Sequence, residues 1–128
     1  MPSDPRHPEI NAVADFLQQC VPFDLLPEDT LHATARQIQV LYLRKGEQIS
    51  ADADDYGLRI LRTGAVEIRS SHGQLMDKLG EGESFNIHGL DVGDEGVTAR
   101  VVEDSLIYLL PRVHYESLRA RFRDFDRH

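Results

Sequence analysis

Apolar residues near the start of the chain recur at the spacing of an α-helix. From Ile10 onward they fall at positions i, i+3, i+4, i+7 and i+11. This pattern predicts an amphipathic helix over residues 9 to 20, which Pro22 ends because proline cannot donate a helical hydrogen bond. A second helix is expected to begin at residues 27–29, where a proline and two acids suit a helix N-terminus, and to run to about Gln37.

After residue 38 the apolar period changes to two. Short apolar runs alternate with glycine-containing turns at a spacing of about ten residues, which predicts short strands. The turns lie at residues 45–46, 63–64, 71–73 and 80–83. Pro111 ends the last strand, and residues 113 to 122 are expected to form a final helix. We therefore expect two helices, seven or eight strands and one more helix, with the strands forming a sandwich, a jelly roll or a small barrel.

The composition is that of one ordinary globular domain. The chain has 128 residues, of which 41% are hydrophobic. A domain of this size buries about two-thirds of its unfolded surface, which stabilises it without a metal or a disulfide. We divide the chain into a flexible lead at residues 1–8, a single domain at 9–125 and a tail at 126–128. In one interpretation this tail is the start of a linker.

Charge and cysteine content limit the partners and the location. A nucleic-acid-binding chain needs a positive surface, so the net charge of −8 argues against direct contact with DNA or RNA. No stretch of the sequence reaches the ~18 apolar residues of a membrane span. The lone Cys20 falls in the apolar stripe of the first predicted helix and is interpreted as a buried hydrophobe. We expect a cytoplasmic protein without membrane contact.

Several sequence pieces, in their order and spacing, resemble the cyclic-nucleotide-binding domain family. They lie at residues 16–17, 22–26, 42–49, 58–68, 80–85 and 101–111, so the resemblance covers about residues 13 to 125. They include the run Leu58-Arg59-Ile60-Leu61-Arg62-Thr63-Gly64 and the turn Gly80-Glu81-Gly82-Glu83. The resemblance implies a mainly β fold with flanking α-helices, specifically a double-sheet β jelly roll with two N-terminal helices and one C-terminal helix.

The run from Glu103 to Pro111 looks most like a bacterial branch of this family. In that branch the domain stands first in a longer signalling protein, ahead of paired cystathionine-β-synthase-type domains and a nucleotidyltransferase-like region. The resemblance implies a non-enzymatic regulatory or sensor domain, whose last helix acts on a downstream domain or on a second copy of the chain. Transcription factors of the family carry a helix-turn-helix after this domain, and the chain ends at His128 without room for one.

In family members that bind a cyclic nucleotide, the ligand lies in a cassette formed by a loop and a short helix between two strands. The resemblance implies that Phe-Gly-Glu opens the cassette, with the glutamate on the ribose 2′-hydroxyl, and that an arginine closes it and holds the phosphate. In this chain Asn86 replaces the glycine and Ile87 the glutamate, while Glu95 or Gly96 replaces the arginine. The candidate ligand-binding residues are Phe85, Asn86, Ile87, His88, Gly89, Leu90, Glu95, Gly96, Val97, Thr98, Ala99 and Arg100.

These replacements weaken the case for cAMP or cGMP, the small-molecule nucleotides that the resemblance implies. An isoleucine accepts no hydrogen bond, and loss of the arginine alone removes ~1.5–3 kcal/mol, or about ten- to a hundred-fold in affinity. Strand alternation from Val97 places Arg100 on the face opposite Ala99 and Val101, so it is expected to point outward unless a bulge shifts the register.

Two other function classes fit parts of the sequence. A degenerate domain without a nucleotide ligand would serve dimerisation, as a homodimer, or contact with a downstream domain. A metal-dependent cupin enzyme would need clustered histidine and carboxylate ligands, but the six histidines are scattered without a His-x-His pair. The sequence also lacks a Gly-x-Ser-x-Gly elbow and a phosphate-binding glycine loop. We expect no metal site, no catalytic residue and no enzyme activity in this chain.

Overall fold

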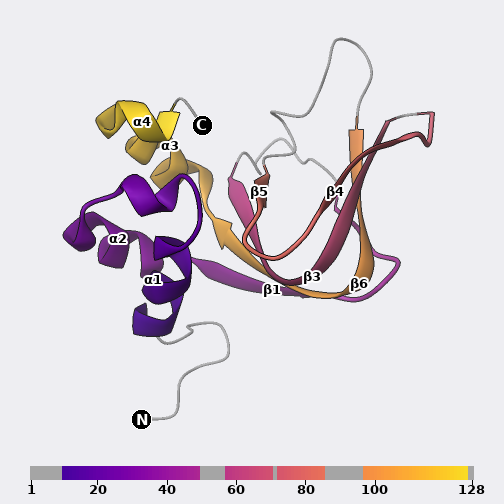
Figure 1. Cartoon of the computed structure of the whole chain (residues 1–128), viewed down its shortest axis with the longest axis horizontal. Coiled ribbons are helices and arrows are strands. Elements are labelled where there is room, and N and C mark those ends of the chain that lie inside the picture. The colour runs from indigo at the N-terminus through magenta and orange to yellow at the C-terminus, as the bar shows by residue number, and fades with distance from the viewer. Residues whose placement is uncertain (1–9, 50–56, 71, 86–96, 127–128) are drawn as a thin grey trace.

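The helices gather at one end of the molecule, and the strands curl into a barrel at the other (Figure 1). The structure, a computed structural model, describes residues 10–49, 57–70, 72–85 and 97–126. The helices are α1 (Ile10–Gln18), the 3-10 helix η1 (Phe23–Leu25), α2 (Glu28–Ala35), α3 (Arg112–Arg121) and α4 (Arg123–Asp126). The strands are β1 (Gln39–Leu43), β2 (Gln48–Ile49), β3 (Leu58–Ser70), β4 (Leu75–Leu79), β5 (Ser84–Phe85) and β6 (Val97–Leu110).

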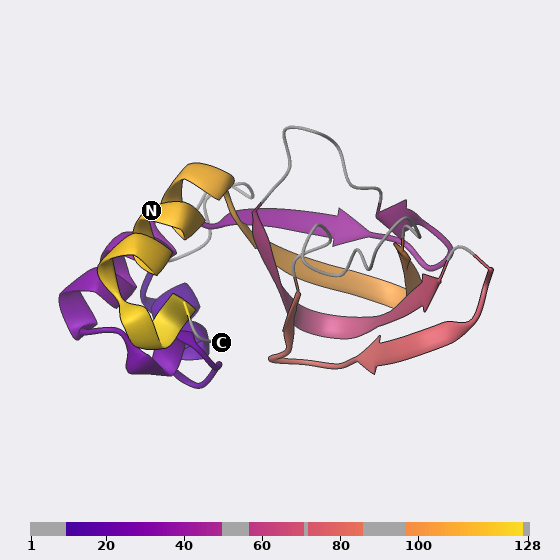
Figure 2. The same cartoon turned by 90° about the horizontal axis from the view of Figure 1, so that it is seen from above.

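The helices form close to where the sequence predicts them. Helices α2 and α3 each follow a proline, Pro27 and Pro111, whose backbone is extended immediately before the first helical turn. The sequence predicts a single C-terminal helix, whereas the structure adds the short helix α4 after an extended residue, Phe122. In both views the N-terminal and C-terminal helices lie together beyond one end of the barrel (Figure 2).

The described strands form one antiparallel sheet in the order β1-β6-β3-β4, with β2 paired to β6 and β5 paired to β3. Among the described residues this sheet has six strands, of which the two central ones are longer than the short strands expected from the sequence. Strand β3 continues through the turn expected at residues 63–64, and β6 spans both of the last two expected strands. The β3–β6 register shifts at three places between Leu61 and Val66, so these turn residues bend a continuous strand instead of ending it.

Gly64 lies at the centre of this bend and is required there. Its φ is +103°, a conformation that other residues rarely adopt. A Cβ atom at this position would lie 2.8 Å from the Cα of Ser105 and closer still to its hydroxyl oxygen. The Ser105 hydroxyl in turn donates to the carbonyl of Glu103 at 2.7 Å. The close approach of β3 and β6 at the bulge therefore depends on a residue without a side chain.

Strand alternation divides the buried residues into two cores. On one face of the long strands, Leu58 and Ile60 join the apolar residues of the helices; we call this cluster the helical core. On the other face, Leu61 and Val66 belong to a cluster inside the barrel, which we call the barrel core. The helical core comprises Val13, Ala14, Leu17, Cys20, Phe23, Leu26, Leu31, Ala35, Ile38, Leu58, Ile60, Tyr108, Leu110, Leu118 and Phe125. The barrel core comprises Ile49, Leu61, Val66, Ile68, Leu79, Phe85, Ala99, Val101 and Ile107.

Cys20 is a buried member of the helical core, as its place in the apolar stripe predicts. Only 3% of the residue is exposed, and its thiol donates to the carbonyl of Phe16 at 3.2 Å. Burial raises the pKa of the thiol above its usual 9.0; Arg62 lowers the pKa and Asp24 raises it, both by smaller amounts. The thiol is therefore held in its protonated form.

This raised pKa predicts a loss of stability in alkaline solution. The folded protein holds the thiol proton more tightly than the unfolded chain does. The contribution of Cys20 to the free energy of unfolding is therefore complete below pH 9.0, the usual thiol pKa, and is lost as the pH rises through the raised pKa of the folded protein. The difference in free energy of unfolding between the wild type and Cys20→Ala, measured by urea unfolding from pH 7 to pH 10.5, should therefore shrink at alkaline pH. Parallel stability curves for the two proteins would contradict this assignment.

Candidate functional site

The described part of the candidate cassette consists of its two flanking strands. Phe85 ends β5 and Val97 begins β6, with Thr98, Ala99 and Arg100 following. The remaining candidates, Asn86, Ile87, His88, Gly89, Leu90, Glu95 and Gly96, lie outside the described residues. Phe85 and Ala99 both belong to the barrel core. The barrel interior therefore contains one candidate residue from each of the two flanking strands.

The turn before β5 fixes the position of Phe85. The backbone of Leu61 donates to the carbonyl of Glu83 at 2.9 Å, and Gly82 donates back to the carbonyl of Leu61 at 2.8 Å. The Glu83 carboxylate accepts from the N–H of Gly80 at 3.1 Å, so this acidic side chain closes its own turn. These bonds hold β5 against β3 and aim the Phe85 ring into the barrel core.

Arg100 lies on the outer face of the barrel. It is exposed, whereas its neighbours Ala99 and Val101 are buried, which is the alternation of an undistorted strand. Its Cα partner on β3 is Glu67, which pairs with Arg69 at 2.8 Å on that outer face. Among the candidate residues that the structure describes, Phe85 and Ala99 therefore face the interior, and Arg100 faces outward.

Arg59 is a charged residue inside the barrel wall that the sequence reading does not single out as a site residue. It is 3% exposed. Its Cα partners are Phe85 on β5 and Leu109 on β6, and directly paired residues of antiparallel strands share a face. Because Phe85 belongs to the barrel core, the side chain of Arg59 leaves the backbone on the inner face of the sheet, beside Phe85, the first residue of the candidate cassette. The only indication of this buried charge in the sequence is that Arg59 interrupts the apolar run of residues 58–61.

Such a side chain has a definite chemistry. An arginine stays charged under all ordinary conditions and offers five N–H donors in a planar fork, which matches a pair of acceptor atoms. Arginine is seldom buried to this extent, because removing its charge from water costs several kcal/mol unless hydrogen bonds and charges around it compensate. Arg59 thus places a strong, directional donor group in an otherwise apolar interior.

The described residues carry few signs of other chemistry. They contain no group of three or more histidine, cysteine, aspartate or glutamate side chains arranged to hold a metal ion. Within the same residues, no helix has the length and apolar character needed to cross a membrane.

Comparison with solved structures identifies the fold. The chain superimposes on the cAMP-bound protein kinase A regulatory subunit PfPKA-R with a TM-score of 0.74 and 14% identity, covering 88% of this chain and 40% of that one. The sensor domain of the transcriptional regulator DNR from Pseudomonas aeruginosa gives a TM-score of 0.70 and 18% identity, covering 84% of this chain and 80% of that one.

A third similar structure is a regulatory subunit of a cAMP-independent protein kinase A from Trypanosoma cruzi, bound to guanosine. Its TM-score is 0.70 and its identity 21%, covering 92% of this chain and 42% of that one. This chain thus spans less than half the length of both kinase regulatory subunits. No family profile and no curated protein sequence matches it. The chain has the jelly-roll fold of cyclic-nucleotide-binding domains.

Proposed function

We propose that this chain is a non-enzymatic regulatory domain that binds a purine nucleoside or nucleotide inside the barrel, between Phe85 and Ala99. The observation that carries the proposal is the buried guanidinium of Arg59 next to Phe85, where the cassette begins. The fold supports it, because similar structures hold cAMP in one case and guanosine in another.

The ligand contacts in this chain must differ from those of a typical cyclic-nucleotide site. The cassette has Ile87 in the position of the ribose-binding glutamate and Glu95 or Gly96 in the position of the phosphate-binding arginine. The guanosine complex of the similar kinase subunit indicates that this fold can bind a purine nucleoside, which has no phosphate. A ligand of this chain is therefore defined by what Arg59 can recognise.

A planar guanidinium recognises two acceptors that lie side by side. In nucleosides the O6 and N7 atoms of guanine form such a pair, and two oxygens of a phosphate form another. Guanosine carries only the first pair, cAMP only the second, and cGMP carries both. These three compounds therefore separate recognition of the base from recognition of the phosphate.

A thermal-shift titration with guanosine, cGMP and cAMP tests the proposal. A ligand at about 100 times its dissociation constant adds ~2.7 kcal/mol, which raises the unfolding midpoint of a chain of this size by roughly 3–6 °C. We expect guanosine and cGMP to give this shift. Arg59→Met should abolish it, because this change removes the guanidinium that recognises the acceptor pair.

The matched control is Arg100→Met, which removes the same charge from the outer face of the barrel. This variant should keep the full ligand-induced shift. Equal loss in both variants would indicate a general charge effect and would contradict the role of Arg59. Shifts with cAMP and cGMP but none with guanosine would assign the phosphate as the recognised group.

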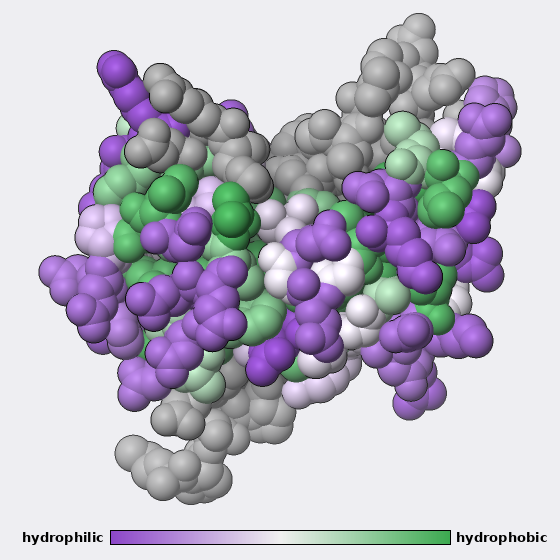
Figure 3. All heavy atoms as spheres, viewed as in Figure 1, coloured by the Kyte–Doolittle hydropathy of each residue, from purple (hydrophilic) through white to green (hydrophobic). Residues whose placement is uncertain are grey.

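A second candidate function is an interaction module without a nucleotide ligand. Exposed apolar side chains favour it: Leu75 and Met76 on β4 are 53% and 50% exposed, and Val113 on α3 is 68% exposed. Charged and polar residues cover much of the visible face, with apolar residues in small patches between them (Figure 3). No thermal shift with any of the three compounds, together with a concentration-dependent dimer in light scattering, would establish this function instead.

Under either function the C-terminal helices α3 and α4 are the elements that would transmit a change in the barrel to another domain or subunit. Leu118 of α3 and Phe125 of α4 lie in the helical core with Leu58 and Ile60 of β3. The same strand carries Arg59 on its other face. A change at the barrel interior therefore has a short path to α3 and α4, through one strand. We propose that these helices act on a downstream domain of a bacterial signalling protein or on a second copy of the chain.

A further inference from the structure

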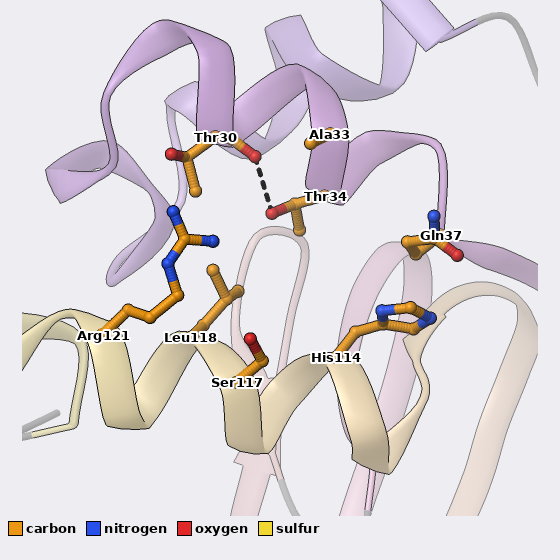
Figure 4. A pocket seen from close by; sticks show the side chains of 8 residues that line it. All are labelled: Thr30, Ala33, Thr34, Gln37, His114, Ser117, Leu118 and Arg121. Atoms are coloured by element: carbon orange, nitrogen blue, oxygen red, sulfur yellow. Dashed lines mark hydrogen bonds between the residues drawn. The ribbon is translucent and has the colours of Figure 1, made fainter.

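A pocket of about 150 Å³ lies between α2 and α3, at the helical end of the molecule and away from the cassette strands (Figure 4). One wall comes from α2 and the turn after it, and the other from α3. The lining residues are Thr30, Ala33, Thr34, Gln37, His114, Ser117, Leu118 and Arg121. On each side they fall at positions i, i+3, i+4 and i+7, so each wall is a single helix face.

The pocket is rich in hydrogen-bond donors, and its lining has no carboxylate. The Thr34 hydroxyl already donates to the carbonyl of Thr30 at 2.8 Å. The hydroxyls of Thr30 and Ser117 are further neutral donors, the first at the same end of the pocket as the Arg121 guanidinium and the second nearer its middle (Figure 4). Arg121 brings a positive charge, and His114 and Gln37 bring further N–H groups at the other end. Such a donor set stands out in a chain whose net charge is −8.

The guanidinium of Arg121 enters the pocket from the last turn of α3. The helix dipole favours a cation in the last turn of α3, which accounts for the charge at this position. The guanidinium carbon lies 5.2 Å from the centre of the Phe122 ring, an arrangement that stacks the group and leaves its N–H edge available. Figure 4 shows this side chain reaching across the pocket toward Thr30 on α2.

We infer that this pocket binds one small oxyanion, a phosphate or a carboxylate group, between Arg121 and Ser117 on α3 and Thr30 on α2. An arginine fork and a hydroxyl make charge-assisted hydrogen bonds to such a group. The volume suffices for the anion with one or two waters, since a water occupies about 30 Å³ of liquid. The bound anion bridges α2 and α3 and fixes the C-terminal helix against the helical end. The pocket is therefore a second ligand site, separate from the barrel, through which an anion acts on the position of α3.

Amide and arginine side-chain NMR spectra of the whole chain test this inference. Sodium phosphate and sodium acetate are titrated separately to 50 mM, with sodium chloride holding the ionic strength constant. We expect saturable shifts at Thr30, Ser117 and the Nε of Arg121, while Ala99 in the barrel stays unchanged. Saturation by phosphate assigns a phosphate group, and saturation by acetate alone assigns a carboxylate.

Two variants of α3 separate a built site from general charge attraction. Arg121→Gln should weaken binding at least about tenfold, because it removes a charge-assisted hydrogen bond. Arg119→Gln removes the same charge two residues away, where the side chain stacks on Tyr115 at 5.5 Å, and should leave the affinity unchanged. Shifts that never saturate, or equal weakening in both variants, would overturn the inference. A barrel that binds no nucleoside would leave it intact, since the two sites share no residue.

Discussion

Replacing Phe125 with alanine is expected to lower the free energy of unfolding by about 3–5 kcal/mol, the range for large-to-small changes at buried aromatic residues. The ring is 3% exposed and stacks edge-on against Phe23 and Tyr115, with centroids 5.3 Å and 6.1 Å away. It thereby joins α4 to η1 and to α3. Because Phe125 touches the helical core and not the barrel core, the helices should loosen before the barrel does.

Hydrogen exchange followed by mass spectrometry, together with urea unfolding, measures this effect. We expect faster exchange in α3 and α4 and nearly unchanged protection in β3 and β6. Val113→Ala on α3 is the control, because that side chain is 68% exposed and should cost little. Uniform loss of protection across the chain would show that the helices and the barrel unfold as one unit and would contradict an output carried by the C-terminal helices.

Replacing Gly64 with alanine is expected to cost about 2–5 kcal/mol, which is a large part of the stability of a small domain. Two effects add. The positive φ of +103° strains any residue with a side chain, and the new methyl group would overlap Ser105 on β6. The bulge that brings β3 close to β6 at this point would have to open. Chemical unfolding monitored by circular dichroism gives the difference directly.

Gly46→Ala separates the two effects. Gly46 also has a positive φ, +95°, but a Cβ there meets no atom within 4 Å. Its replacement should therefore cost only the backbone strain, about 1–2 kcal/mol. Equal losses for the two variants would show that the contact with Ser105 adds nothing, and the account of the bulge would be wrong.

Much of the fold follows from local patterns. The apolar spacing from Ile10 and the prolines at 22, 27 and 111 place the helices within a few residues of their observed ends. The outward position of Arg100 also follows, since it needs only strand alternation from Val97. The order of the sequence pieces that resemble cyclic-nucleotide-binding domains predicts the jelly roll that the similar solved structures share.

The features that local patterns miss depend on contacts distant in the sequence. Gly64 looks like the end of a strand, yet it bends a continuous one, because the space for the bend is set by Ser105 on β6. Arg59 looks like a surface charge among apolar residues, and only its pairing with Phe85 and Leu109 shows that it is buried. The α2–α3 pocket joins residues 30–37 to residues 114–121, which no local pattern connects. The candidate residues Asn86 to Leu90, Glu95 and Gly96 lie outside the described residues and remain predictions from the sequence.

Methyl NMR spectra of the whole chain, labelled at alanine, isoleucine and leucine, test the central claim that the barrel interior beside Arg59 binds a purine nucleoside. In a titration with guanosine, Ala99, Ile107 and Leu109 should shift saturably, while Ala14 and Leu118 in the helical core should change little. The shifts should disappear in Arg59→Met and persist in Arg100→Met. Unchanged barrel methyl groups at millimolar guanosine and cGMP, or shifts confined to the helical core, would contradict the claim.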